Sequence, residues 1–284
     1  MKGLVLSGGG AKGAYQVGVL RRWLGEEQRK YDIICGVSVG ALNGSFLAQY
    51  PIGQEKLASI ELTALWAGID TAAIYKKWFG WEVAALWKSS VYNSAPLQRL
   101  VREKLNLEKV RSSGKKLRVG AASLTNGRYV LFGEDHPKLH DAILASSSFP
   151  AMLSPIEIDG ELWTDGGVRD VTPLSAAIKL GADTVDVVLC SSPGVDHKFP
   201  KKPNALKVAA RALDIMSDEV IENDLKLVDY VNRLVKVNAA ASGKRHIDVT
   251  LVRPKNSLTD NSLDFSPAGL RRMIEQGYND AIGV

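Results

Sequence analysis

Apolar residues along the chain gather in two kinds of segment that alternate. Short apolar runs at residues 4–7 and 33–37 have the length and composition of buried strands. Each is followed by a longer segment, at residues 14–27 and 39–49, that reads as a helix. This alternation predicts an α/β fold with a largely parallel, buried central sheet.

Later segments continue the pattern. Further strands are predicted at residues 117–122, 128–132, 185–190 and 247–252. Gly127 lies between the first two and is typical of a hairpin turn. No internal repeat and no linker divides the chain, so we expect a single domain over residues 1–284, with the chemical motifs within about residues 4–175.

Residues 204–235 predict one long helix or a broken pair of helices. Its apolar positions recur at spacings of three and four: Leu206, Ala209, Leu213, Met216 and Val220. We expect this apolar face to pack on the core and the opposite face, which carries mixed charges, to contact water.

Composition and charge exclude some classes of protein. The 284 residues are 45% hydrophobic and carry a formal net charge of +5, which is compatible with an anionic lipid surface and does not predict a nucleic-acid partner. Cys35 and Cys190 stand inside apolar runs, so we expect buried core residues, and no cysteine pattern predicts a metal site. No run is apolar enough for a membrane span or a signal peptide. We expect a cytoplasmic location, with membrane association and export without an N-terminal signal left open.

A glycine-rich stretch, GGGAKG, follows the first predicted strand. It contains Gly8, Gly9, Gly10, Lys12 and Gly13. Successive glycines leave backbone N–H groups free to approach a negatively charged group. The anion is either a bound phosphate or the oxyanion of a reaction intermediate.

A second glycine motif, GVSVG, supplies a candidate nucleophile. Ser38 lies between Gly36 and Gly40, where the second predicted strand turns into a helix. In this context G-x-S-x-G predicts a nucleophile elbow, in which the glycines permit a strained turn that exposes the serine hydroxyl.

Asp165 is a stronger candidate than any histidine for the base that activates Ser38. It ends a strand-like run and is followed by Gly166 and Gly167, which permit a sharp turn and a close approach to the carboxylate. Asp170 is the nearest competitor but lacks the glycine turn. An apolar pocket would raise the pKa of such a carboxyl and make it a better base.

Histidine, the usual base for serine, is a weaker candidate in this chain. None of the four lies beside glycines or other small residues: His136, His140, His197 and His246.

The surroundings of the glycine loop favour the oxyanion. A dinucleotide site requires an acidic residue at the end of the second strand, whereas Asp32 stands at its start. A phosphate-binding P-loop requires a lysine followed by Ser or Thr, whereas Lys12 precedes Gly13. We therefore expect the N–H groups of residues 8–10 to hold the oxyanion that forms when Ser38 attacks an ester. Lys12 adds positive potential or holds a headgroup there.

The order GGGAKG, GVSVG, DGG resembles the patatin-like phospholipase family, and ASSSFPAM at residues 145–152 is also similar to a segment of that family. The resemblance implies a three-layer α/β/α sandwich and a dyad of Ser38 and Asp165, with neither cofactor nor metal. It also implies hydrolysis of fatty-acyl esters of phospholipids or lysophospholipids through an acyl-enzyme.

Four tryptophans gather between residues 65 and 92: Trp66, Trp78, Trp81 and Trp87. Because tryptophan favours the membrane–water boundary, we expect this segment to line or cover an acyl channel and to touch the bilayer. The alternative is an aromatic flank of the core.

Three other functions compete with this interpretation. An esterase with a Ser–Asp–His triad would combine Ser38 and Asp165 with His197 or His246, but in that fold several strands precede the nucleophile. A nucleotide-binding module would use the loop of residues 8–13. A lipid-binding protein would keep the pocket without turnover.

Overall fold

The computed structural model describes residues 1–78, 88–194, 203, 205–237 and 244–284. Within these residues a central sheet has the strand order β10-β9-β1-β2-β5-β8-β7, and β6 pairs with β5 beside that path. The strands are β1 (Lys2–Leu6), β2 (Ile33–Val37), β5 (Lys116–Ser123), β6 (Tyr129–Gly133), β7 (Ile156–Ile158), β8 (Glu161–Asp165), β9 (Thr184–Val188) and β10 (Asp248–Val252).

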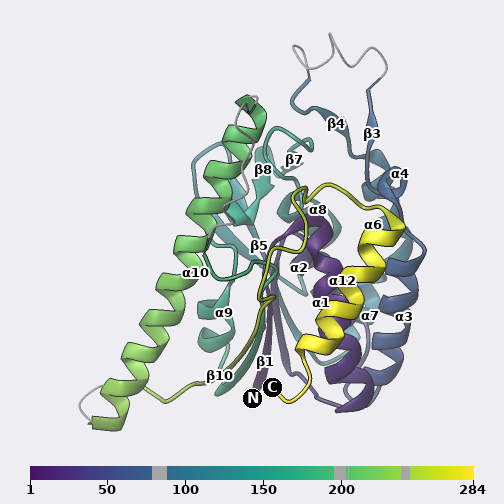
Figure 1. Ribbon diagram of the computed structural model, residues 1–284. Coiled ribbons are helices and arrows are strands. Elements are labelled where there is room, and N and C mark those ends of the chain that lie inside the picture. Colours follow the sequence, from purple (N-terminus) through teal and green to yellow (C-terminus); the bar gives the residue numbers. More distant parts are fainter. Residues whose placement is uncertain (79–87, 195–202, 204, 238–243) are drawn as a thin grey trace.

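The sheet is mostly parallel. All pairings from β10 to β5 are parallel, whereas β6 and β8 run antiparallel to β5, and β7 runs antiparallel to β8. Gly127, with a φ of 73°, turns the chain between β5 and β6, as the hairpin prediction requires. A separate antiparallel pair, β3 (Lys76–Lys77) and β4 (Tyr92–Asn93), extends beyond the sheet (Figure 1).

Helices cover both faces of the sheet, which confirms the three-layer α/β/α prediction (Figure 1). One face carries α1 (Gly13–Leu20), α2 (Val39–Leu47), α3 (Glu55–Ala67), α4 (Thr71–Ile74), α6 (Ala95–Lys104), α7 (Leu107–Ser112), α8 (Leu139–Ser146) and α12 (Pro267–Asp280). The other face carries α9 (Leu174–Lys179) and α10 (Ala205–Val237). Shorter helical segments are η1 (Gly10–Lys12), η2 (Arg21–Glu26) and η3 (Gly166–Val168).

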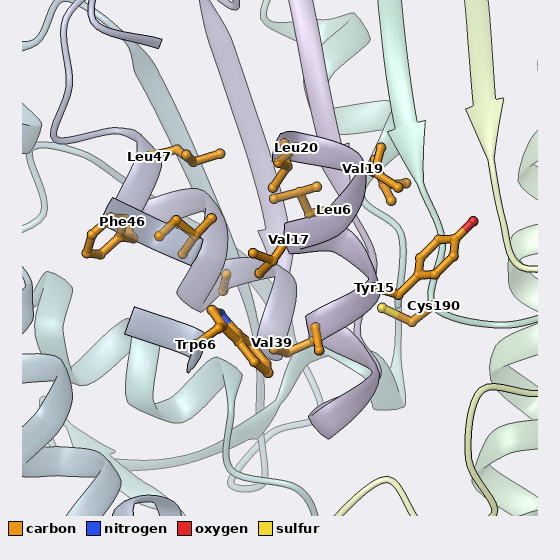
Figure 2. Packing of buried hydrophobic residues seen from close by; sticks show 14 of the residues in the cluster. Leu6, Tyr15, Val17, Val19, Leu20, Val39, Phe46, Leu47, Trp66 and Cys190 are labelled. Carbon is orange, nitrogen blue, oxygen red and sulfur yellow. The ribbon is translucent and has the colours of Figure 1, made fainter. Parts of the chain in front are cut away.

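Alternation along the strands explains the two cores. Leu4 and Leu6 pack into the cluster beneath α1 and α2, whereas Val5 faces the cluster beneath α9 and α10. Figure 2 shows the first cluster, in which Val17 of α1 packs near Leu6 of the sheet and Val39 of α2. Because both faces are covered, the central strands are apolar throughout, as the sequence predicts.

The predicted elements near Ser38 are confirmed with small shifts of their ends. The helix predicted at 14–27 is α1, which begins at Gly13 and continues into the wider turns of η2. The helix predicted at 39–49 ends at Leu47.

The inward face of α10 differs from the predicted one. The structure buries Ile221 against the sheet, with Leu225 and Val228 packed beside it, whereas Met216 is 60% exposed. The side chains of Leu206, Ala209 and Leu213 lie outside the described part of the structure, so the difference is shown at Met216. The outer side of the helix also exposes Leu227 and Tyr230, so it is not purely polar. The heptad-like spacing could not distinguish these faces, because apolar residues occupy both.

The single-domain expectation stays a prediction. Among the described residues, no helix is long and apolar enough to cross a membrane.

Candidate active site

Ser38 occupies a strained turn between β2 and α2. Its φ of 55° and ψ of −127° lie where residues with a Cβ atom are rarely found. A Cβ atom at Gly36 would lie 2.3 Å from the carbonyl oxygen of Gly40, and one at Gly40 would lie 2.2 Å from that of Leu6. Both glycines are therefore needed for the close backbone contacts of the elbow.

The serine-rich end of α8 holds this elbow in place. The N–H of Ser38 donates to Oγ of Ser146 at 2.9 Å, and the Ser147 hydroxyl donates to the Ser38 carbonyl at 3.2 Å. The next residue, Ser148, accepts the N–H of Asp165 through its carbonyl at 3.1 Å. The ASSSF segment thus positions both candidate catalytic residues, a role that its sequence alone did not indicate.

Asp165 lies at the end of β8 with only 3% of its surface exposed. Burial raises the pKa of its carboxyl to about 6, and the Ser38 hydroxyl and the Gly167 N–H partly offset this rise. Oδ1 accepts the Gly167 N–H at 2.8 Å. Oδ2 is buried and has no hydrogen-bond partner among the described residues.

Ser38 and Asp165 are brought together at one cavity, which both line. The Ser38 hydroxyl is close enough to lower the pKa of this carboxyl, which partly offsets the rise that burial causes. The unpartnered Oδ2 is thus a free proton acceptor beside a serine hydroxyl. A Cβ at Gly166 would lie 2.3 Å from the Gly120 carbonyl oxygen, so the turn after Asp165 also requires glycine.

The glycine loop lines the same cavity, but its three N–H groups differ. The N–H of Gly8 donates to the Val171 carbonyl at 3.0 Å and is therefore engaged. Among the described residues, no group accepts the N–H of Gly9 or Gly10. A Cβ at Gly9 would lie 2.5 Å from Cβ of Cys190, which explains why this position has no side chain.

The two remaining motif residues have different surroundings. Lys12 is half-buried and lines the cavity beside the glycine loop. Gly13 begins α1, and a Cβ there would lie 2.2 Å from Cγ2 of Val39. It therefore allows α1 to approach α2 closely, which is a packing role.

The cavity has a volume of about 1160 Å³ and runs from Ser38 into an apolar region between α2, α3, α4, α6 and α8. Its size exceeds the upper end of the range of about 300–1,000 Å³ typical of pockets for small ligands. The apolar side chains that line it include Phe46, Leu62, Leu65, Trp66, Ile69, Ile74, Leu97, Val101, Ile143, Met152, Leu153 and Phe265. The cavity thus has room for a long apolar group next to Ser38.

The tryptophan cluster divides in the structure. Trp66 is buried in the core and lines the cavity, which fits the expected lining role. Trp78 is half-buried near β3 and donates to the Ser90 carbonyl at 3.1 Å. Trp81 and Trp87 lie outside the described residues.

The histidines that the structure describes do not line this cavity. His140 contacts the Leu105 carbonyl, and His246 pairs with Asp248. His136 packs against the ring of Phe132. His197 lies outside the described residues. Of the two histidines considered for a Ser–Asp–His triad, His246 does not line the cavity, so His197 is the remaining candidate.

Asp32 does not support a dinucleotide site. Its Oδ2 accepts the N–H of Lys2, at the first residue of β1, whereas the glycine loop follows the last. The two features thus lie at opposite ends of the same strand.

A serine at a strand–turn–helix elbow, beside a buried carboxyl and an apolar cavity, places the molecule among candidate serine acyl hydrolases. The sequence comparison narrows this class. Residues 4–178 match the family model described as patatin-like phospholipase, and the chain belongs to that family.

Several curated proteins are similar over the same region. An uncharacterised NTE family protein of Mycobacterium tuberculosis is 28% identical over 192 residues, covering 66% of this chain and 49% of that protein. The lysophospholipase NTE1 of Kluyveromyces lactis is 27% identical over 218 residues, covering 70% of this chain and 13% of that protein. The chain thus spans about half the length of the mycobacterial relative. Among solved structures, VipD from Legionella pneumophila aligns with a TM-score of 0.48 and 14% identity, over 99% of this chain and 66% of that one.

Proposed function

We propose that this protein is a serine acyl hydrolase that cleaves fatty-acyl esters of phospholipids or lysophospholipids with a dyad of Ser38 and Asp165. The observation that carries the proposal is the unpartnered, buried Oδ2 of Asp165 beside Ser38 in an apolar cavity. Membership of the patatin-like phospholipase family and the similarity to a yeast lysophospholipase support the choice of a lipid ester.

In the first half of the reaction, Oδ2 of Asp165 accepts the Ser38 proton as Oγ attacks the ester carbonyl carbon. The carbonyl oxygen becomes an oxyanion, and the free N–H groups of Gly9 and Gly10 donate to it. Gly8 then has a packing role in this scheme, since its N–H already bonds Val171. When the intermediate collapses, the leaving alcohol takes the proton back from Asp165 and the acyl group remains on Oγ.

In the second half, Asp165 takes a proton from water, and the resulting hydroxide attacks the acyl-enzyme carbonyl. The Ser38 oxygen leaves and recovers its proton from Asp165, which releases the fatty acid. The apolar cavity holds the acyl chain in both halves, while Lys12 at the loop adds positive potential near the developing charge or a phosphate headgroup.

Membrane contact is a further part of the proposal, because a lipid ester must reach the cavity from a bilayer or a micelle. The β3–β4 extension lies at the end of the molecule toward which the carboxyl ends of the parallel strands point (Figure 1). Ser38 lies at that same end, directly after β2. Trp78 beside β3 is therefore suited to touch the lipid surface.

Fluorophosphonate labelling followed by a lipid panel tests the dyad. We expect the wild-type protein to be labelled and to release fatty acid from phosphatidylcholine or lysophosphatidylcholine. Ser38→Ala abolishes labelling, and Asp165→Asn lowers hydrolysis by about 10⁴-fold, the scale seen for loss of a catalytic-triad member. Asp170→Asn is the matched control and retains activity. Labelling that persists in Ser38→Ala contradicts the proposal.

A further inference from the structure

Two buried side-chain amides hold the two ends of the glycine loop. Nε2 of Gln16 donates to the carbonyl of Ser7, immediately before the loop, at 2.8 Å. Nδ2 of Asn43 donates to the carbonyl of Gly13, the last residue of the motif, at 3.2 Å. Gln16 is 0% exposed and Asn43 is 1% exposed. The loop has few side chains of its own, so these contacts from outside fix its position.

The two amides are also bonded to each other and to the wall of the cavity. Nδ2 of Asn43 donates to Oε1 of Gln16 at 3.0 Å, and Nε1 of Trp66 donates to Oδ1 of Asn43 at 2.8 Å. An indole N–H can only donate, so Oδ1 must face Trp66 and Nδ2 must face the loop. The orientation of the Asn43 amide is thereby determined, since both its N–H bonds and its oxygen are used.

Asn43 also connects the loop to the nucleophile. It lies on α2, the helix that begins directly after Ser38. Figure 2 shows Trp66 beside Val39 on this helix. A Cβ at Gly13 would lie within 3.1 Å of both Val39 and Trp66, so the parts fit tightly.

We infer that Asn43 is a positioning residue for catalysis, which holds the N–H groups of Gly9 and Gly10 in register with Oγ of Ser38. Gln16 and Trp66 support it by fixing the amide. The inference rests on the proposed hydrolase function. A misplacement of about 1 Å costs about 10²-fold in rate, so the effect of losing this residue is large even though it touches no reacting atom.

Asn43→Ala removes the link, and Gln49→Ala is its matched control. Gln49 is a buried amide just beyond the same helix, and it bonds the Phe46 and Lys104 carbonyls and the Asn106 N–H. With a soluble short-chain ester, we expect Asn43→Ala to lower kcat by about 10²-fold with little change in KM, whereas Gln49→Ala keeps kcat. Circular dichroism and thermal unfolding establish that both variants are folded.

A thionoester substrate separates positioning of the donors from a general structural effect. Sulfur accepts hydrogen bonds weakly, so well-placed N–H groups favour the ester over the thionoester. We expect the ester-to-thionoester ratio of kcat/KM to fall in Asn43→Ala and to stay at the wild-type value in Gln49→Ala. If Asn43→Ala does not fold, Trp66→Phe removes the donor to Oδ1 together with part of the buried ring, and the ester-to-thionoester ratio, which a change in packing alone does not lower, should fall in the same way to a smaller extent.

The inference is overturned if a folded Asn43→Ala keeps the wild-type kcat, or if it loses activity with an unchanged ratio. Failure of the proposed function is distinguished beforehand, because in that case the wild-type protein and Ser38→Ala hydrolyse the ester equally.

Discussion

Oδ1 of Asp165 accepts the N–H of Gly167 at 2.8 Å, and this bond divides the roles of the two carboxylate oxygens. With Oδ1 engaged, the buried Oδ2 is the atom left to receive a proton. Burial raises the pKa of this carboxyl from its ordinary 3.8 to about 6, which suits a base that works near neutral pH. The raised pKa of Asp165 therefore predicts how hydrolysis and stability change with pH.

Hydrolysis should have an acid limb near pH 6. The base must be ionised to accept the Ser38 proton, so kcat/KM rises as pH increases through the pKa of Asp165, about 6. A pH–rate profile with a soluble ester measures this. The pKa of Asp170 is also raised to about 6 by burial, and Asp170→Asn is therefore the necessary control. If the acid limb disappears in Asp170→Asn, the titrating group is Asp170, and the assignment of the limb to Asp165 is contradicted.

Asp165→Asn should make the protein more stable near pH 8. The folded-state pKa of about 6 exceeds the ordinary value of 3.8, so the ionised carboxylate opposes folding above pH 6. A shift of this size corresponds to about 3 kcal/mol, an upper bound because the asparagine amide is also buried. Lowering pH from 6 toward 4 protonates the folded wild type and should remove the difference. Urea unfolding at both pH values tests this, and an equal gain at both would contradict it.

The strained backbone at Ser38 predicts that the stability of the protein depends on which residue replaces this serine. With φ at 55°, Ser38 adopts a conformation that glycine reaches easily and alanine does not. Ser38→Gly should therefore be more stable than Ser38→Ala by about 1–2 kcal/mol, although both lack activity. Comparing two inactive variants removes the effect of the lost hydroxyl. Equal thermal stabilities would show that the elbow is relaxed.

The fold was predictable because it depends on local signals, and so was the placement of Ser38 and Asp165 in sharp turns at one cavity. Strand and helix periods identified the α/β core, and the glycines marked the elbow at Ser38 and the turn after Asp165. These glycines are needed where backbones approach within van der Waals contact, as at Gly40 and Leu6. Such contacts leave a signature in the sequence because no other residue fits.

Contacts between distant elements left no such signature. Asn43, on the helix after Ser38, is one polar residue among small ones, and only the structure shows its bonds to Gly13 and Trp66. The engaged N–H of Gly8 depends on Val171, a residue far along the chain. The prediction that Met216 of α10 faces inward was wrong for a related reason. Apolar residues such as Met216 and Ile221 occupy two sides of the helix, so the sequence pattern does not identify the buried side.

Trp78→Ser should weaken binding to phospholipid vesicles and spare hydrolysis of a soluble ester. Trp78 lies beside β3, at the end of the molecule where we propose lipid contact. Tyr230→Ser is the control, because Tyr230 is 62% exposed in the C-terminal half of α10, away from β3 (Figure 1). Vesicle sedimentation measures both. Equal loss of vesicle binding in the two variants would contradict the proposed contact between Trp78 and the lipid surface.

Phe46 lines both the cavity at Ser38 and a second cleft. Four residues line both hollows, namely Phe46, Leu65, Lys104 and Leu105. The second cleft, of about 950 Å³, is bordered by charged side chains such as Glu61 and Arg102. Phe46 lies eight residues after Ser38 along α2, which corresponds to about 12 Å of helix. An extended acyl chain advances about 1.2 Å per bond, so a chain of about ten carbons lying along α2 reaches this ring.

Phe46→Ala should therefore shift the preference of the enzyme toward longer acyl chains. Removing the ring joins the two hollows, and long chains that must otherwise bend toward α6 gain a straight path. We expect the ratio of kcat/KM for a sixteen-carbon ester to that for an eight-carbon ester to rise by about tenfold, worth about 1.4 kcal/mol. The variant also loses about 3–5 kcal/mol of stability, because Phe46 is only 8% exposed. Phe46→Leu keeps most of the wall and should keep the wild-type chain-length profile. A folded Phe46→Ala with an unchanged profile would show that acyl chains do not run along α2.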